Sequence, residues 1–131
     1  MELKRVVVTG LGALTPIGNN IEEYWDGLKS GKSGCAEITS FDASNFKTQF
    51  ACEVKNFDPS SFFDRKEARK LDKFAQYALV SSDEAIADAG IDLDAVDKFR
   101  VGVIWGAGIG GIKTFQDEVE NWATGNGTPR F

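Results

Sequence analysis

The sequence predicts an α/β fold that supplies part of a sheet rather than a complete one. Two mainly apolar runs, residues 4–9 and 100–105, have the length and composition of strands, and helical patterns follow both of them. Strands that alternate with helices are typical of a parallel sheet covered by helices. Both runs carry apolar residues at consecutive positions, which indicates strands covered on both faces. Because such a sheet normally has more than two strands, we expect a partial one.

After the first strand, the amino-terminal part predicts a loop and a helix. Glycine and proline are too frequent in residues 10–18 for regular structure. Asn20 is a residue type that caps helices, and Glu23 follows it at the spacing of a capping box. We therefore expect a helix over residues 21–30, which Gly31 ends.

The middle of the chain predicts an irregular insertion and then a long helix. Turn-forming residues and scattered aromatics over residues 32–60 leave room for one short strand, near residues 46–54. From residue 64 to residue 89, apolar and small residues recur along one helical face, and Gly90 supplies a stop. The many alanines in this stretch indicate close approach to a neighbouring element.

A glycine-rich loop lies between the second strand and the last helix, which we expect over residues 112–123 before a tail loop. Residues 106–111, GAGIGG, satisfy the G-x-G-x-x-G pattern of dinucleotide-binding proteins. That fingerprint also needs an acidic residue about 20 positions further on. Residues 125–131 contain none. A fragment of a nucleotide-binding oxidoreductase is therefore kept as an alternative.

Charge and composition exclude several classes of partner. The formal net charge of −5 predicts no general attraction to nucleic acid or to an anionic membrane. No apolar run approaches the roughly 18 residues that cross a bilayer, and the start of the chain is unlike a signal peptide. We therefore expect a cytoplasmic protein that binds neither nucleic acid nor membrane.

Two cysteines, Cys35 and Cys52, lie seventeen positions apart in a chain without histidine. A zinc site needs about four ligands at paired spacing, so we expect no metal site. A disulfide is compatible with this spacing but is rare in a reducing compartment. The interpretation we favour is that both thiols pack in or near the core.

Four segments, in order along the chain, resemble the β-ketoacyl-[acyl-carrier-protein] synthases of type II fatty-acid synthesis. Residues 5–34, RVVVTGLGALTPIGNNIEEYWDGLKSGKSG, resemble the opening of these condensing enzymes. Residues 38–59, ITSFDASNFKTQFACEVKNFDP, are similar to their next segment. Residues 65–92, RKEARKLDKFAQYALVSSDEAIADAGID, and residues 101–118, VGVIWGAGIGGIKTFQDE, resemble the long helix and glycine loop of the elongating members.

The resemblance implies that residues 1–131 are the amino-terminal part of a ketosynthase domain. The expected fold is then an incomplete first half of a thiolase-like fold, with layered helices and a mixed sheet. Members of the family work as homodimers and need no cofactor. They join a malonyl group to an acyl chain held on acyl carrier protein, with loss of carbon dioxide. The resemblance thus implies an acyltransferase of fatty-acid biosynthesis.

The catalytic residues that the resemblance implies are absent from this chain. The family uses a cysteine nucleophile and two histidines, which lie in parts of the enzyme beyond the matched segments. Neither Cys35 nor Cys52 follows a strand or opens a helix that could lower its pKa. Since there is no histidine either, we expect this chain alone to be inactive.

A basic cluster lies at the start of the expected long helix. Residues 64–73 hold five positive and three negative charges in a chain whose net charge is negative. Cations at a helix amino-terminus oppose its dipole, and several of these lie one turn apart as like-charge pairs. An acidic partner would explain the cluster, and acyl carrier protein is strongly acidic. By resemblance, Lys66, Arg69 and Lys70 match the carrier-docking surface; the alternative is a solvated helix face.

Ile109 is the one bulky residue within the glycine loop. In the type II family, the matching position lines the acyl pocket and influences which chain lengths fit. Glycines on both sides let the backbone come close to a neighbour or a ligand. Ordinary packing of the loop apex is the alternative.

Two further expectations concern the chain as a unit. A free-standing module that binds acyl carrier protein without chemistry remains an alternative function. In addition, we expect the strands near Val6 and Val103 to be neighbours or nearly so, with outer edges that nothing in this chain pairs.

Overall fold

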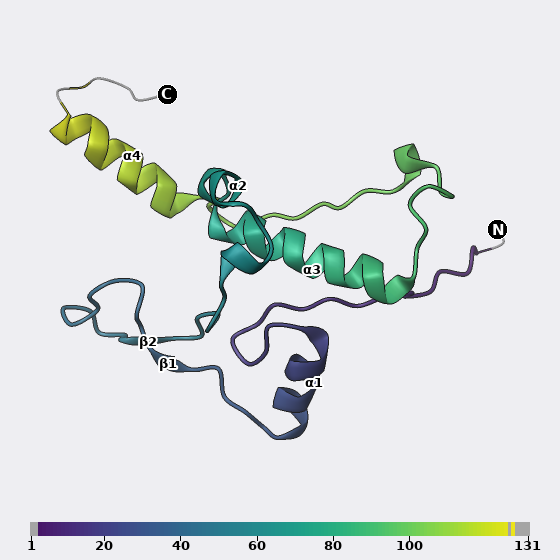
Figure 1. The fold of residues 1–131 in the computed structure, drawn as a ribbon. Coiled ribbons are helices and arrows are strands. Elements are labelled where there is room, and N and C mark those ends of the chain that lie inside the picture. Colours follow the sequence, from purple (N-terminus) through teal and green to yellow (C-terminus); the bar gives the residue numbers. More distant parts are fainter. Residues whose placement is uncertain (1–2, 126, 128–131) are drawn as a thin grey trace.

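A 17-residue helix, α3 (Lys73–Ala89), is the centre of the molecule, and the other elements are arranged around it (Figure 1). The computed structural model describes residues 3–125 and 127. The last residues of the expected tail loop, 126 and 128–131, therefore lie outside the described residues. Gly90 ends α3 in the left-handed conformation, at φ 60°, as the sequence predicts.

The alanine-rich face of α3 receives the loop that follows the amino-terminal segment. A Cβ atom on Gly10 would lie 2.2 Å from the carbonyl oxygen of Ala85, and one on Gly12 would lie 2.0 Å from that of Ser81. Any side chain at either glycine would therefore push the loop away from the helix. This contact confirms the close approach that the small residues indicate.

Glu84 of α3 joins the same loop to helix α1 (Ile21–Lys29). One carboxylate oxygen accepts a hydrogen bond from the backbone N–H of Ala13 and the other from that of Ile21, both at 2.8 Å. At the start of α1, the side chain of Asn20 accepts from the N–H of Glu23 at 2.8 Å. Helix α1 and the cap by Asn20 are thus confirmed, although α1 ends one residue early, at Lys29. The carboxylate of Glu23 accepts from the N–H of Asn19, at 2.8 Å, and not from that of Asn20 as in a capping box.

A small antiparallel hairpin follows α1. Strand β1 (Ala36–Glu37) pairs with β2 (Phe50–Ala51), with Ala36 opposite Ala51. The short strand expected within residues 46–54 is confirmed, but its partner was not predicted. The expectation of core thiols is wrong, because Cys35 and Cys52 are both exposed. They flank the ladder at the open end of the hairpin.

The helix predicted over residues 64–89 is interrupted. The structure has a short helix, α2 (Arg65–Lys70), and then α3, because Leu71 adopts an extended conformation with ψ 125°. The side-chain nitrogen of Gln76 donates to the carbonyl oxygens of Ala68 and Leu71, at 2.8 and 3.0 Å. These bonds satisfy carbonyl groups that the end of α2 leaves without helical partners, which stabilises the break.

The two predicted strands are not formed. Residues 4–9 and 101–105 run as extended segments on opposite sides of α3, separated from each other in the view of Figure 1. No backbone hydrogen bond joins them in the described part of the chain. Because the segments around Val6 and Val103 lie on opposite sides of α3, the expectation that they are neighbours is also wrong. Val6 and Val103 are 88% and 59% exposed. Both runs have strand character but lack a paired backbone on either side.

The remaining elements are short or peripheral. Two single 3-10 turns are formed by Pro59–Ser61 and Lys98–Arg100. Helix α4 (Ile112–Thr124), predicted over residues 112–123, projects away from the amino-terminal end of α3 (Figure 1). Among the described residues, no helix has the length and apolar character that crossing a membrane requires.

The chain exposes far more surface than a closed domain of its size. Its accessible area is 11103 Å², whereas a folded monomer of 14.3 kDa exposes about 6,800 Å². Among the described residues, the buried apolar side chains are only Ala43, Ala78 and Val80. The excess of about 4,300 Å² is comparable to the total area buried in an obligate interface. Most of the large apolar side chains of the described residues are therefore exposed.

Candidate functional site

Helix α2 presents the basic residues that the sequence singles out. Lys66, Arg69 and Lys70 are all exposed, and none forms an ion pair in the described part of the chain. Asp64 caps the helix by accepting from the N–H groups of Lys66 and Glu67, at 2.7 and 2.8 Å. The three cations therefore form one accessible positive surface, which we call the α2 basic face.

The break at Leu71 corrects one argument from the sequence. Arg69 and Lys70 lie in the last turn of α2, where positive charge is favoured by the helix dipole, and not at the start of a long helix. The dipole thus stabilises these two cations. Arg65 and Lys66 in the first turn of α2, and Lys73 at the start of α3, keep the unfavourable position. The like-charge pairs at one-turn spacing remain within α2.

Asp72 joins the start of α3 to the start of α4. The hydroxyl group of Thr114 donates a hydrogen bond to its carboxylate, 42 residues away in sequence. A Cβ atom on Gly111, the amino-terminal cap residue of α4, would lie 2.1 Å from the same carboxylate. The last glycine of GAGIGG therefore allows a carboxylate, not a phosphate, to approach the positive end of a helix. This geometry argues against the dinucleotide alternative.

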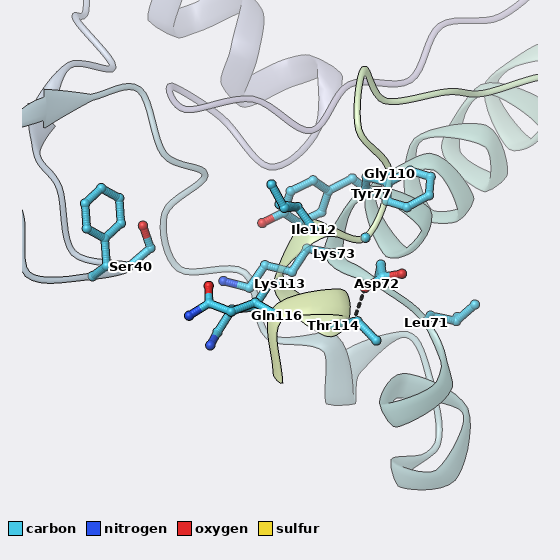
Figure 2. A pocket seen from close by; sticks show the side chains of 13 residues that line it. Ser40, Leu71, Asp72, Lys73, Tyr77, Gly110, Ile112, Lys113, Thr114 and Gln116 are labelled. Atoms are coloured by element: carbon cyan, nitrogen blue, oxygen red, sulfur yellow. Dashed lines mark hydrogen bonds between the residues drawn. The ribbon is translucent and has the colours of Figure 1, made fainter. Parts of the chain in front are cut away.

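An open hollow of about 830 Å³ lies between this junction and the hairpin loop (Figure 2). In that view Ser40 of the hairpin loop faces α3 and α4 across the open space. The α2–α3 junction contributes wall residues to the hollow, so the α2 basic face adjoins it. The residues that line it are Ser40, Phe41, Leu71, Asp72, Lys73, Phe74, Tyr77, Gly110, Gly111, Ile112, Lys113, Thr114 and Gln116.

Ile109 lies beside the hollow but does not line it. Its side chain is 78% exposed, so the alternative of ordinary packing at the loop apex is not seen in this chain. The next residue, Gly110, does line the hollow and has φ 69°, a conformation that favours glycine. Ile109 is thus held by a tight turn at the edge of the hollow.

The surroundings raise the pKa of two groups that line the hollow, Tyr77 and Lys113. Burial raises the pKa of Tyr77, and the negative charge of Glu53 raises it further. The ring of Tyr77 meets that of Phe57 edge to face, with centroids 5.2 Å apart. A hydrogen bond to Asp117 raises the pKa of Lys113. Both Tyr77 and Lys113 therefore stay protonated at neutral pH.

Glu53 fastens the hairpin loop. Its carboxylate accepts from the hydroxyl and N–H groups of Thr39, at 2.7 and 3.0 Å, and from the N–H of Ser40 at 3.2 Å. Hydrogen bonds from Ser40 and Thr39 lower its pKa from 4.5 to about 2. The wall of the hollow that Ser40 forms thus depends on an ionised Glu53.

Acid should loosen this loop within a defined pH window. Because the folded-state pKa of Glu53 is depressed, its stabilising effect is complete above pH 4.5 and is lost as the pH falls through about 2. We expect pepsin cleavage after Phe41 and Phe46 to accelerate several-fold over this window, relative to a reference peptide. Glu53→Gln mimics the protonated form, so its relative cleavage rate should stay level. Equal pH dependence in both proteins would contradict the role of Glu53.

The described residues contain no cluster of three or more potential metal-binding side chains. Cys35 and Cys52 flank the hairpin strands, and neither lies in the first turn of a helix, where a thiolate would be stabilised. The described residues thus form an exposed basic face next to a mainly apolar hollow.

Comparison with known proteins decides the family. Residues 3–129 match the family model described as the β-ketoacyl synthase N-terminal domain. The chain belongs to the β-ketoacyl synthase family. The 3-oxoacyl-[acyl-carrier-protein] synthase 2 of Synechocystis sp. is 48% identical over 118 residues, which make up 90% of this chain and 28% of that enzyme. The ketosynthase chain therefore spans little more than a quarter of the length of this curated relative.

Solved structures give the same family and fold. The ishigamide ketosynthase/chain length factor has a TM-score of 0.77 and 32% identity, covering 92% of this chain and 30% of the other. A type II polyketide ketosynthase, solved in complex with its acyl carrier protein and bound to the hexaketide, has a TM-score of 0.72 and 28% identity. That match covers 92% of this chain and 31% of the other. The ketosynthase chain is therefore an incomplete thiolase-like domain, as predicted.

Sequence reasoning missed three residues that shape this region. Asp72, Glu53 and Glu84 each join segments by side-chain bonds, over 42 positions in the case of Asp72 and Thr114. Only Asp72 had a local signal, because aspartate is a preferred residue at a helix start. The family match also replaces the oxidoreductase alternative.

Proposed function

We propose that this chain is the amino-terminal portion of a β-ketoacyl-[acyl-carrier-protein] synthase that elongates fatty acids. The whole enzyme would condense a malonyl group with an acyl chain, both held on acyl carrier protein, and release carbon dioxide. The observation that carries the proposal is the match of residues 3–129 to one domain of this family. Homodimerisation and a cytoplasmic location belong to the same proposal, by analogy with the family.

The chain would contribute binding surfaces rather than chemistry. The α2 basic face would dock the acidic carrier, and a carrier–ketosynthase complex among the structural neighbours supports a partner of this type. The face adjoins the hollow at Leu71–Lys73, so a docked carrier would sit close to an apolar cavity. Without histidine, and with both cysteines on the exposed hairpin, the chain alone would leave acyl and malonyl carriers unchanged.

A chimera tests the proposal. Residues 3–129 would replace the matching segment of the Synechocystis synthase, which is 48% identical. We expect the chimera to release carbon dioxide from malonyl carrier and to lengthen an acyl carrier, whereas the 131-residue chain does neither. A well-folded chimera without condensation, or a stoichiometric acyl adduct on Cys35 or Cys52 of the chain, would overturn it.

Substitution of Ile109 tests the acyl-pocket assignment. In the chimera, Ile109→Phe adds bulk at the edge of the hollow, and overpacking typically costs about 1–3 kcal/mol. We expect kcat/KM for long acyl chains to fall about tenfold or more while that for short chains changes little. Ile109→Leu keeps the volume and should retain both activities. Equal losses for short and long chains would indicate general damage to the loop.

A further inference from the structure

Cys35 and Cys52 flank the hairpin ladder at its open end. Strand pairing sets Ala36 opposite Ala51 and Glu37 opposite Phe50. Each cysteine is the next residue outward from the Ala36–Ala51 pair, where the same register, continued by one residue, sets Cys35 opposite Cys52. Directly opposite residues of an antiparallel ladder point to the same face of the sheet. Both thiols are free and exposed. The fold thus brings together two nucleophilic groups that are seventeen positions apart in sequence.

The type of pair is set by the alternation of hydrogen bonds along the ladder. The N–H of Ile38 donates to the carbonyl oxygen of Gln49 at 3.0 Å, so residues 38 and 49 form a hydrogen-bonded pair. Hydrogen-bonded pairs recur at every second position, so Ala36 and Ala51 are the next such pair. Continued by one residue beyond Ala36 and Ala51, the alternation makes Cys35 and Cys52 a non-hydrogen-bonded pair. In such pairs the Cα atoms lie about 4.5 Å apart, which is within the range of about 4.4–6.8 Å that a disulfide spans.

Side-chain hydrogen bonds, not further strand pairing, hold the two chain segments next to the cysteines. The side-chain nitrogen of Lys55 donates to the carbonyl oxygen of Gly34 at 3.0 Å. On the loop side, Glu53 accepts from Thr39 and Ser40. The segments that enter and leave the hairpin are therefore tied next to the two thiols.

We propose that Cys35 and Cys52 are a modification site that closes to an intrachain disulfide. One thiolate attacks a low-molecular-weight disulfide such as oxidised glutathione and releases one glutathione thiol. The second thiolate then attacks the mixed disulfide at the protein sulfur and releases the other. Overall, two protein thiols are oxidised, one glutathione disulfide is reduced, and two glutathione thiols leave with the protons. The bond would clamp the base of the loop that carries Ser40 and Phe41 to the hollow.

Equilibration with glutathione tests the site in the 131-residue chain. Equal amounts of isotope-labelled and unlabelled chain are mixed, oxidised, alkylated and mapped by mass spectrometry, so that intrachain and interchain bonds are told apart even where chains associate. We expect a Cys35–Cys52 peptide pair of matched label. The equilibrium constant for forming this disulfide should be at least about tenfold larger in buffer than in concentrated urea. This difference corresponds to a midpoint potential that is about 30 mV lower in buffer.

A one-residue shift provides the matched control. Ala51→Cys combined with Cys52→Ser keeps two thiols and nearly the same loop length, but places the second thiol on the opposite face of the ladder. We expect this variant's intrachain disulfide with Cys35 to form with nearly the same equilibrium constant in buffer and in urea. The proposal is overturned if the parent shows the same constant in buffer and in urea. It is also overturned if the shifted variant closes as readily as the parent, or if the labels mix freely.

Discussion

Made alone, the 131-residue chain will associate and will lack a cooperative thermal transition as a monomer. Its exposed area exceeds that of a closed domain of its mass by about 4,300 Å². Val6 and Ile104, at 88% and 102% exposure, lie in apolar extended segments whose backbone groups have no sheet partner among the described residues. Such segments are templates for intermolecular pairing. Sedimentation velocity and calorimetry will show oligomers and a broad transition.

Two substitutions, one in each extended segment, should have opposite effects in the isolated chain and in the chimera. Val6→Thr with Ile104→Thr removes exposed apolar surface, so the isolated chain should associate less. In the chimera these positions should be buried in the sheet, where each unsatisfied hydroxyl costs about 1–3 kcal/mol, so its Tm should fall. Lys47→Thr with Arg100→Thr alters exposed polar residues and should affect Tm in neither direction. A monodisperse, cooperatively folding parent chain would contradict this prediction and favour a free-standing carrier-binding module.

Charge reversal on the α2 basic face should weaken carrier binding strongly. In the chimera, Lys66→Glu with Arg69→Glu replaces attraction to the acidic carrier by repulsion. We expect Kd to rise about tenfold or more at low salt, mainly through slower association. Screening should reduce the difference as ionic strength increases. Turnover at saturating carrier should change much less, because the hollow is left intact. Stopped-flow binding and steady-state kinetics measure the two effects.

A second double reversal separates docking from net charge. Lys47→Glu with Arg100→Glu changes the total charge equally but lies on the hairpin loop and after α3, away from α2. Both residues are exposed, and neither forms an ion pair in the described part of the chain. This control should bind carrier nearly as the parent does. If both double variants weakened binding equally, or if neither did, the α2 basic face would be only a solvated surface.

Sequence patterns predicted those elements that are determined by residues within about one helical turn of each other. The cap by Asn20 and the stop at Gly90 fixed α1 and the end of α3, because each acts within one helical turn. The alanines of α3 also indicated a close neighbour, and Gly10 and Gly12 provide it. The resemblance of four segments then gave the family, which short motifs such as GAGIGG could not.

Contacts distant in sequence account for what the patterns missed. The helical periodicity continues across the break between α2 and α3, which Gln76 stabilises. At this break Asp72 meets Thr114, 42 residues away, and no local pattern predicted that contact. The apolar runs at residues 4–9 and 100–105 were predicted as strands, but a strand needs a partner backbone that these runs do not find. Among the candidate site residues, Lys66, Arg69 and Lys70 lie together on α2, while Ile109 lies beside the hollow and not in its wall.

Hydrogen exchange of the two extended segments tests most directly whether this chain is an incomplete ketosynthase domain. Amides of residues 4–9 and 100–105 would be followed by mass spectrometry in the isolated chain and in the chimera with the Synechocystis synthase. We predict exchange within seconds in freshly diluted chain. In the chimera, pairing with the rest of the sheet should slow the same amides about a thousandfold or more. Rapid exchange of both segments in an active, folded chimera would contradict this account.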